Sequence, residues 1–109
     1  MTSRFSLAIL TAALFVIPAT GHAEDYVITI KDHTFSPNEL TVPANQKITL
    51  TIKNTDSTAE EFESHDLKRE KIVKGNSEIK INVGPLKAGE YTFYGEYHED
   101  TAKGKIIAK

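Results

Sequence analysis

The sequence contains no cysteine and no tryptophan, and its one methionine is the first residue, Met1. Without cysteine the protein cannot form disulfide bonds, and it has no N-terminal cysteine to which a lipid anchor could be attached. A thiolate is absent as a metal ligand for the same reason, and Met1 is the only source of a thioether. Candidate metal ligands are therefore carboxylates and imidazoles, which suit harder ions than sulfur does.

Long hydrophobic runs are also scarce, and the only marked one lies at the N-terminus. It spans residues 7–17, follows Arg4 and is interrupted by Pro18. A transmembrane anchor is the alternative interpretation, but a spanning helix needs about 20 apolar residues. The run and the small residues Gly21 and Ala23 are typical of a secretory signal peptide. We therefore expect a signal peptide at residues 1–23, a single domain at residues 24–109 and a location in the periplasm.

An excess of basic charge is missing as well. The chain has 13 Lys and Arg against 15 Asp and Glu, a net charge of −2 at pH 7, and loss of Arg4 with the leader makes it more negative. No stripe of Lys or Arg is present, so we expect no nucleic-acid partner. Nothing indicates hydrolytic catalysis, since the sequence has no zinc-protease motif and no Gly-rich phosphate loop.

Apolar residues recur with a period of two through most of the chain, which is typical of half-buried strands. The clearest case is "QKITLTIKN", where Ile48, Leu50 and Ile52 alternate with polar residues. Similar segments begin near residues 26, 39, 62, 77, 91 and 104. Residues 67–73 are ambiguous between a short helical turn and a strand. Some seven short strands with turn signals between them predict an all-β fold, an antiparallel β-sandwich.

Several phrases then resemble a known family: "FSPNELTVPANQKITLTIKNTDS", "EEFESHDLKREK" and "GPLKAGEYTFYGEYHEDTAKGKI". Together they resemble the cupredoxin fold, a Greek-key β-sandwich, across nearly the whole of residues 24–109. The similarity is greatest to cupredoxin-like periplasmic proteins of bacterial iron or copper uptake. These include the partners of iron permeases and the N-terminal domain of the ferrous-iron transport protein EfeO.

Blue-copper cupredoxins hold their metal with two His, one Cys and a weak axial Met. The resemblance places His98 on the second histidine and Gly95 on the cysteine. The axial methionine falls near Ala102 or Lys103, and the first histidine falls on Glu60. This chain therefore lacks the sulfur ligands of a blue-copper centre.

The resemblance implies instead a carboxylate–histidine site for copper and/or iron. Its candidate ligands are His33, Glu60, Glu61, Glu96 and His98. Neighbouring residues of a strand point to opposite faces, so Glu60 and Glu61 can both be ligands only if the segment bulges or loops. Glu96 is either a ligand or a partner of one, and with Glu99 and Asp100 it supplies negative charge.

Each candidate also has a structural interpretation. Taken alone, His98 fits a solvated loop residue, Glu60 and Glu61 fit solvated acids at a strand start, and His33 fits a turn residue. Glu63 and His65 continue one strand face away from the loops, and we expect them to be solvated.

We therefore expect a periplasmic metal-binding protein that supplies or conditions iron or copper for an inner-membrane iron permease. Two alternatives remain open: a ferroxidase-type metal oxidase, and a metal-free interaction module with the same fold. Formation of a homodimer through an acidic face also remains open.

Overall fold

Two β-sheets make up the part of the chain that the structure, a computed structural model, describes, which is residues 24–109. The expected signal peptide, residues 1–23, lies outside the described residues. The strands are β1 (Glu24–Lys31), β2 (Thr34–Ser36), β3 (Glu39–Val42), β4 (Ile48–Asn54), β5 (Glu60–Ser64), β6 (Arg69–Val73), β7 (Ser77–Val83), β8 (Gly89–Gly95) and β9 (Lys103–Ala108), with one short 3-10 helix, η1 (Glu96–His98).

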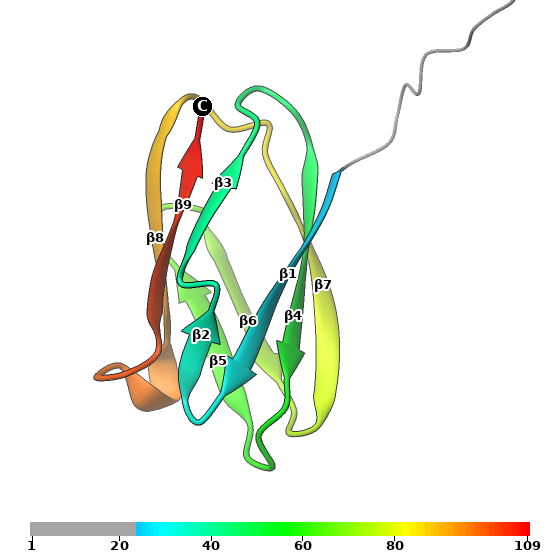
Figure 1. Ribbon diagram of the computed structural model, residues 1–109, viewed down its shortest axis with the longest axis vertical. Coiled ribbons are helices and arrows are strands. Elements are labelled where there is room, and N and C mark those ends of the chain that lie inside the picture. The colour runs from blue at the N-terminus through cyan, green and yellow to red at the C-terminus, as the bar shows by residue number, and fades with distance from the viewer. Residues whose placement is uncertain (1–23) are drawn as a thin grey trace, which may run out of the picture.

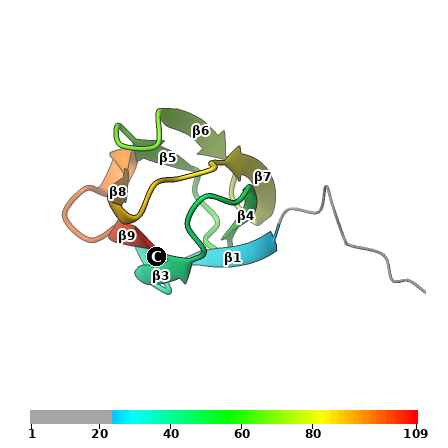
Figure 2. The ribbon, with the colours of Figure 1, turned by 90° about the horizontal axis from the view of Figure 1, so that it is seen from above.

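The strand order is β2-β1-β4-β7 in one sheet and β3-β9-β8-β5-β6 in the other. The predicted β-sandwich is confirmed. Its sheets are mixed rather than antiparallel throughout, because β1 pairs in parallel with β4 and β3 pairs in parallel with β9. Both pairs join strands that run from the same end of the sandwich, which periodicity alone does not reveal. Seen along the strands, the two sheets surround one interior (Figure 2).

The ambiguous segment 67–73 contains a turn and a strand. Residues 65–68 form the turn of a hairpin, and β6 then pairs with β5 so that Ser64 lies opposite Arg69 and Glu60 lies opposite Val73. Alternation is hard to see in the sequence because β6 is an edge strand and buries only Val73. Its charged residues face solvent, as is common on edge strands.

Three phenylalanines, Phe35, Phe62 and Phe93, pack together in the core, with ring centroids 5.1 to 6.1 Å apart. All three side chains are buried. Edge-to-face and offset contacts at these separations stabilise aromatic clusters. Since strand side chains alternate between faces, residues two positions further along β5 and β8 toward the strand ends also point inward.

Four connections meet at the end of the sandwich beyond these phenylalanines, the lower end in Figure 1. They are the β1–β2 turn, the β4–β5 loop, the β6–β7 turn and the segment from β8 through η1 to β9. Hydrogen bonds connect three of them. Asp56 of the β4–β5 loop accepts from backbone N–H groups of the β1–β2 turn, and Thr101, after η1, donates to a backbone carbonyl of the same turn. Residues 24–109 contain no helix with the length and hydrophobicity that a membrane span requires.

Candidate metal centre

Three residues at the loop end of the sandwich lie two positions along the chain from a core phenylalanine. Glu60 is two residues before Phe62 on β5, and both face the interior. Gly95, at the end of β8, is likewise two residues after Phe93 and is buried. His33 precedes Phe35 by the same spacing but lies in the β1–β2 turn, where its φ is 58°. Three distant segments thus converge above one aromatic cluster.

His33, Glu60 and His98 each offer a ligand atom, and these atoms all lie within 4.8 Å of one another. The imidazole rings of His33 and His98 are stacked, with centroids 3.6 Å apart and planes inclined by 11°. Oε1 of Glu60 lies 2.7 Å from Nδ1 of His98. Two imidazoles and one carboxylate are a donor set that binds divalent transition metals.

The carboxylate of Glu60 is buried, with 1% of the residue exposed. Its Oε2 accepts hydrogen bonds from the backbone N–H of Glu61 at 3.0 Å and of Tyr97 at 2.9 Å. Because a carboxylate oxygen can only accept, Nδ1 of His98 is the donor to Oε1. Three donors therefore compensate for the cost of burying this group, and they fix η1 against β5.

His33 is held from two sides by residues that the sequence did not single out. Asp56 accepts from the N–H of Asp32 at 2.8 Å and of His33 at 3.0 Å, and its Oδ2 lies 3.5 Å from His33 Nδ1. Thr101 donates to the His33 carbonyl at 2.6 Å. The hydrogen bond from the His33 N–H, aided by that from Asp32, lowers the pKa of Asp56 although partial burial opposes this.

Asp56 is positioned in turn by the buried Asn54. The side-chain oxygen Oδ1 of Asn54 accepts from the Asp56 N–H at 3.0 Å, and its side-chain nitrogen Nδ2 donates to the backbone carbonyls of Thr58, Val73 and Lys74. The only sequence signal for this arrangement is "NTDS", whose Asn and Asp favour turns that bond their own backbone. That signal predicts a turn but not its contact with His33.

Glu61 does not join the histidines. It faces the opposite side of β5, where Glu61, Glu63 and Glu70 offer carboxylate oxygens within 4.8 Å of one another. The segment contains no bulge, since Glu60 and Glu61 pair regularly with Val73 and Ile72. The condition for both glutamates to be ligands is therefore not met, and Glu60 is the one that reaches the histidines.

The carboxylates of Glu61, Glu63 and Glu70, here called the outer carboxylate cluster, lie close enough to repel one another when ionised. A hydrogen bond with Glu70, followed by burial and by the charges of Glu70, Glu63 and Glu96, raises the pKa of Glu61 to about 7. Burial and the charge of Glu70 also raise the pKa of Glu63. Instead of being freely solvated, Glu63 thus belongs to a crowded acidic face. His65, as predicted, is exposed; its Nε2 lies 3.2 Å from the hydroxyl of Tyr94.

Glu96 is exposed at the start of η1. It lines, with His33 and residues 97–101, an open hollow of about 590 Å³ above the imidazole rings. Glu99 and Asp100 lie on the same rim. Glu96 makes no hydrogen bond to either histidine among the described residues, so its contribution there is negative charge, which favours cations.

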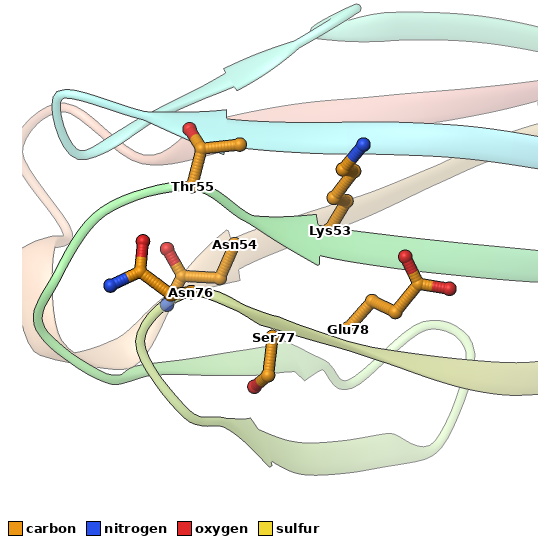
Figure 3. A pocket seen from close by; sticks show the side chains of 6 residues that line it. All are labelled: Lys53, Asn54, Thr55, Asn76, Ser77 and Glu78. Atoms are coloured by element: carbon orange, nitrogen blue, oxygen red, sulfur yellow. The ribbon is translucent and has the colours of Figure 1, made fainter.

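A separate hollow of about 360 Å³ lies between the end of β4 and the start of β7 (Figure 3). Its lining residues are Lys53, Asn54, Thr55, Asn76, Ser77 and Glu78. It contains none of the candidate ligands, and the amide of Asn54 in its wall is already engaged with three carbonyls. The histidine-lined hollow is therefore the candidate site.

Comparison with known proteins agrees with this architecture. An uncharacterized protein of Rickettsia prowazekii (strain Madrid E) is 58% identical over 80 residues, which cover 73% of this chain and 64% of that relative. The chain thus spans less than two thirds of that relative's length.

Solved structures share the fold at low sequence identity. Auracyanin A of Chloroflexus aurantiacus superposes with a TM-score of 0.69 at 16% identity, over 81% of this chain and 100% of that one. Amicyanin of Paracoccus versutus gives 0.61 at 18% identity, over 85% of each chain. Residues 5–108 match the family described as Cupredoxin-like domain. The chain therefore belongs to the family of cupredoxin-like domains.

Proposed function

We propose that the protein binds a divalent metal ion through His33, Glu60 and His98 and acts as a metal carrier in the periplasm. The observation that carries this proposal is the convergence of three ligand atoms within 4.8 Å from three separate segments. A blue-copper electron carrier does not fit the site, because the chain has no cysteine and no methionine after Met1.

The donor set favours some metals over others. Two imidazole nitrogens and one carboxylate oxygen suit Cu(II), Zn(II) and iron, whereas Cu(I) prefers sulfur. Among divalent ions of the first transition row, Cu(II) binds such sites most tightly. We therefore propose copper or iron as the cargo and expect Cu(II) to give the highest affinity in solution.

The contact between His98 Nδ1 and Glu60 Oε1 has a consequence for binding. An ion held by both atoms takes the place of the proton that they share, so binding releases protons and weakens as the solution becomes acidic. The negative rim formed by Glu96, Glu99 and Asp100 attracts cations to the hollow. Hydrogen bonds between the backbone of His33 and the side chains of Asp56 and Thr101 hold His33 in place before the ion binds.

We further propose that the recipient of the metal is an inner-membrane iron permease. The expected signal peptide supports the periplasmic location, and the resemblance to the cupredoxin-like partners of iron permeases supports the partner. The exposed histidine-bearing end leaves the site open to a partner, since 42% of the His33 side chain and 29% of the His98 side chain are solvent-exposed.

Titration calorimetry with Cu(II) and Zn(II), with a competing chelator where affinity is high, tests the binding site. We expect one ion per chain, and a loss of at least tenfold in affinity in His33→Ala and in His98→Ala. His65→Ala is the matched control, because His65 lies outside the site. Glu61→Gln tests whether the outer face of β5 contributes to metal affinity, and we expect no change there. Equal affinities in the His98→Ala and His65→Ala variants would refute the proposed site.

A further inference from the structure

The backbone at Gly95 does not require glycine. Its φ is −96° and its ψ is 115°, an extended conformation that any residue adopts. What the position lacks is space. A Cβ atom built on Gly95 would lie 2.6 Å from Cδ of Glu60, 2.8 Å from Oε1 of Glu60 and 2.8 Å from Cβ of Ala102.

The Glu60 carboxylate cannot easily give way. It is buried and receives hydrogen bonds from the N–H groups of Glu61 and Tyr97 and from His98 Nδ1. Any shift that made room for a side chain at position 95 would break some of these bonds inside the protein, where an unpaired donor is costly. A side chain at position 95 and the carboxylate at position 60 therefore compete for one volume.

We infer that Gly95 is a specificity-determining residue, because its missing side chain leaves that volume to Glu60 and so makes oxygen the third donor beside the two imidazoles. This inference rests on the proposed metal site. It implies that the Glu60 carboxylate, in the position it has here, and a side chain at position 95 exclude each other. Oxygen selects harder ions than a thiolate would.

The exclusion can be tested without metal by a double-mutant cycle, which isolates the interaction between two positions. Urea unfolding in EDTA would compare Gly95→Ala in the wild type and in Glu60→Ala. We expect Gly95→Ala to lower the midpoint clearly in the wild type and less in the Glu60→Ala background, the remainder coming from Ala102. A decrease of equal size in both backgrounds would overturn the inference.

Gly104→Ala is the matched control. A Cβ there would lie 2.5 Å from the Phe93 ring and 2.8 Å from the Asn38 carbonyl oxygen, so its nearest neighbours do not include Glu60. Its effect on the midpoint should be the same in both backgrounds. If Glu60 changed the effect of both glycine substitutions alike, the coupling would not be specific to Gly95, which would also count against the inference.

Cobalt(II) binding tests the choice of donor. In Gly95→Cys alone, we expect Co(II) affinity to fall at least tenfold, because the two side chains contend for one volume. In Glu60→Ala/Gly95→Cys we expect binding to recover, together with a thiolate-to-cobalt charge-transfer band that the wild type lacks. Gly95→Cys binding Co(II) as tightly as the wild type does would contradict the inference. If the wild type binds no Co(II), Cu(II) or Zn(II), the proposed function fails, whereas the metal-free cycle still decides the steric exclusion.

Discussion

The buried Glu60 pairs with the partly exposed His98, with Oε1 of the first 2.7 Å from Nδ1 of the second, where η1 packs against β5. The pair links the edge of the core to the loop end of the sandwich. The carboxylate accepts three hydrogen bonds, two of them from backbone groups of Glu61 and Tyr97. It is therefore both a candidate ligand and a part of the framework that holds the site.

Replacing Glu60 should destabilise the protein even without metal. Glu60→Ala removes the acceptor of the N–H groups of Glu61 and Tyr97 and of Nδ1 of His98, all partly buried contacts. A buried donor that loses its partner costs about 1–3 kcal/mol. We expect a decrease of roughly 3 kcal/mol in the free energy of unfolding, with Glu60→Gln intermediate because its amide keeps one acceptor oxygen. Urea unfolding in EDTA measures the difference.

Glu61→Ala serves as the control for that measurement, since it alters the neighbouring carboxylate on the opposite face of β5. Its loss should leave stability unchanged or raise it, because Glu61 lies among other carboxylates. If Glu60→Ala and Glu61→Ala proved equally stable, the hydrogen bonds to Glu60 would not have the structural role assigned to them.

Asp56 should position His33 for binding. Asp56→Ala removes the acceptor for the N–H groups of Asp32 and His33, two residues whose φ angles are 52° and 58°. Carboxylates that orient metal-binding histidines typically contribute 10–100-fold to metal affinity. We expect a loss of that size in Zn(II) titrations, and faster hydrogen exchange at the amides of Asp32 and His33.

Asp66 provides a matched control because it also accepts a backbone N–H, from Thr92, and its pKa is lowered chiefly by that bond. It lies in the β5–β6 turn, at the opposite end of β5 from Glu60. Asp66→Ala should leave Zn(II) affinity unchanged. An affinity in Asp56→Ala equal to that of the wild type would remove Asp56 from the site.

The outer carboxylate cluster should make stability depend on pH. The pKa of Glu61 rises from 4.5 to about 7, with the hydrogen bond to Glu70 as the largest cause. The folded protein therefore binds the proton more tightly than the unfolded chain does. The resulting stabilisation is fully present below pH about 4.5 and is lost as the pH rises through about 7.

Thermal unfolding between pH 4 and 8 checks this dependence. The difference in Tm between the wild type and Glu61→Gln should change across the window, and Glu70→Gln should shift the change toward lower pH because the chief cause of the raised pKa is gone. A difference that stayed constant from pH 4 to pH 8 would show that Glu61 does not take up this proton.

The sequence predicted the sandwich because most strands bury alternate residues, as Ile48, Leu50 and Ile52 do. It could not predict the parallel pairs β1–β4 and β3–β9, since residue alternation is the same in either direction. The strand β6 was ambiguous for a different reason: only one of its five residues is buried.

Within the site, the alternation of strand residues indicates which of the two glutamates faces the interior. Phe62 faces inward, so Glu60 must do so too and Glu61 must face outward in any regular strand. The contribution of Asp56 was not accessible from sequence, because it acts through backbone N–H groups of a turn more than twenty residues away. The volume shared by Gly95 and Glu60 likewise depends on how β5 and β8 lie against each other, which alternation does not reveal.

Pulsed electron paramagnetic resonance on the protein loaded with one equivalent of Cu(II) tests the metal site most directly, because it counts the imidazoles bound to the ion. We expect two imidazoles in the wild type and in His65→Ala, and one in His33→Ala and in His98→Ala. A wild-type spectrum without imidazole, or a count that neither His33→Ala nor His98→Ala reduces, would contradict the assignment of His33, Glu60 and His98 as the metal site.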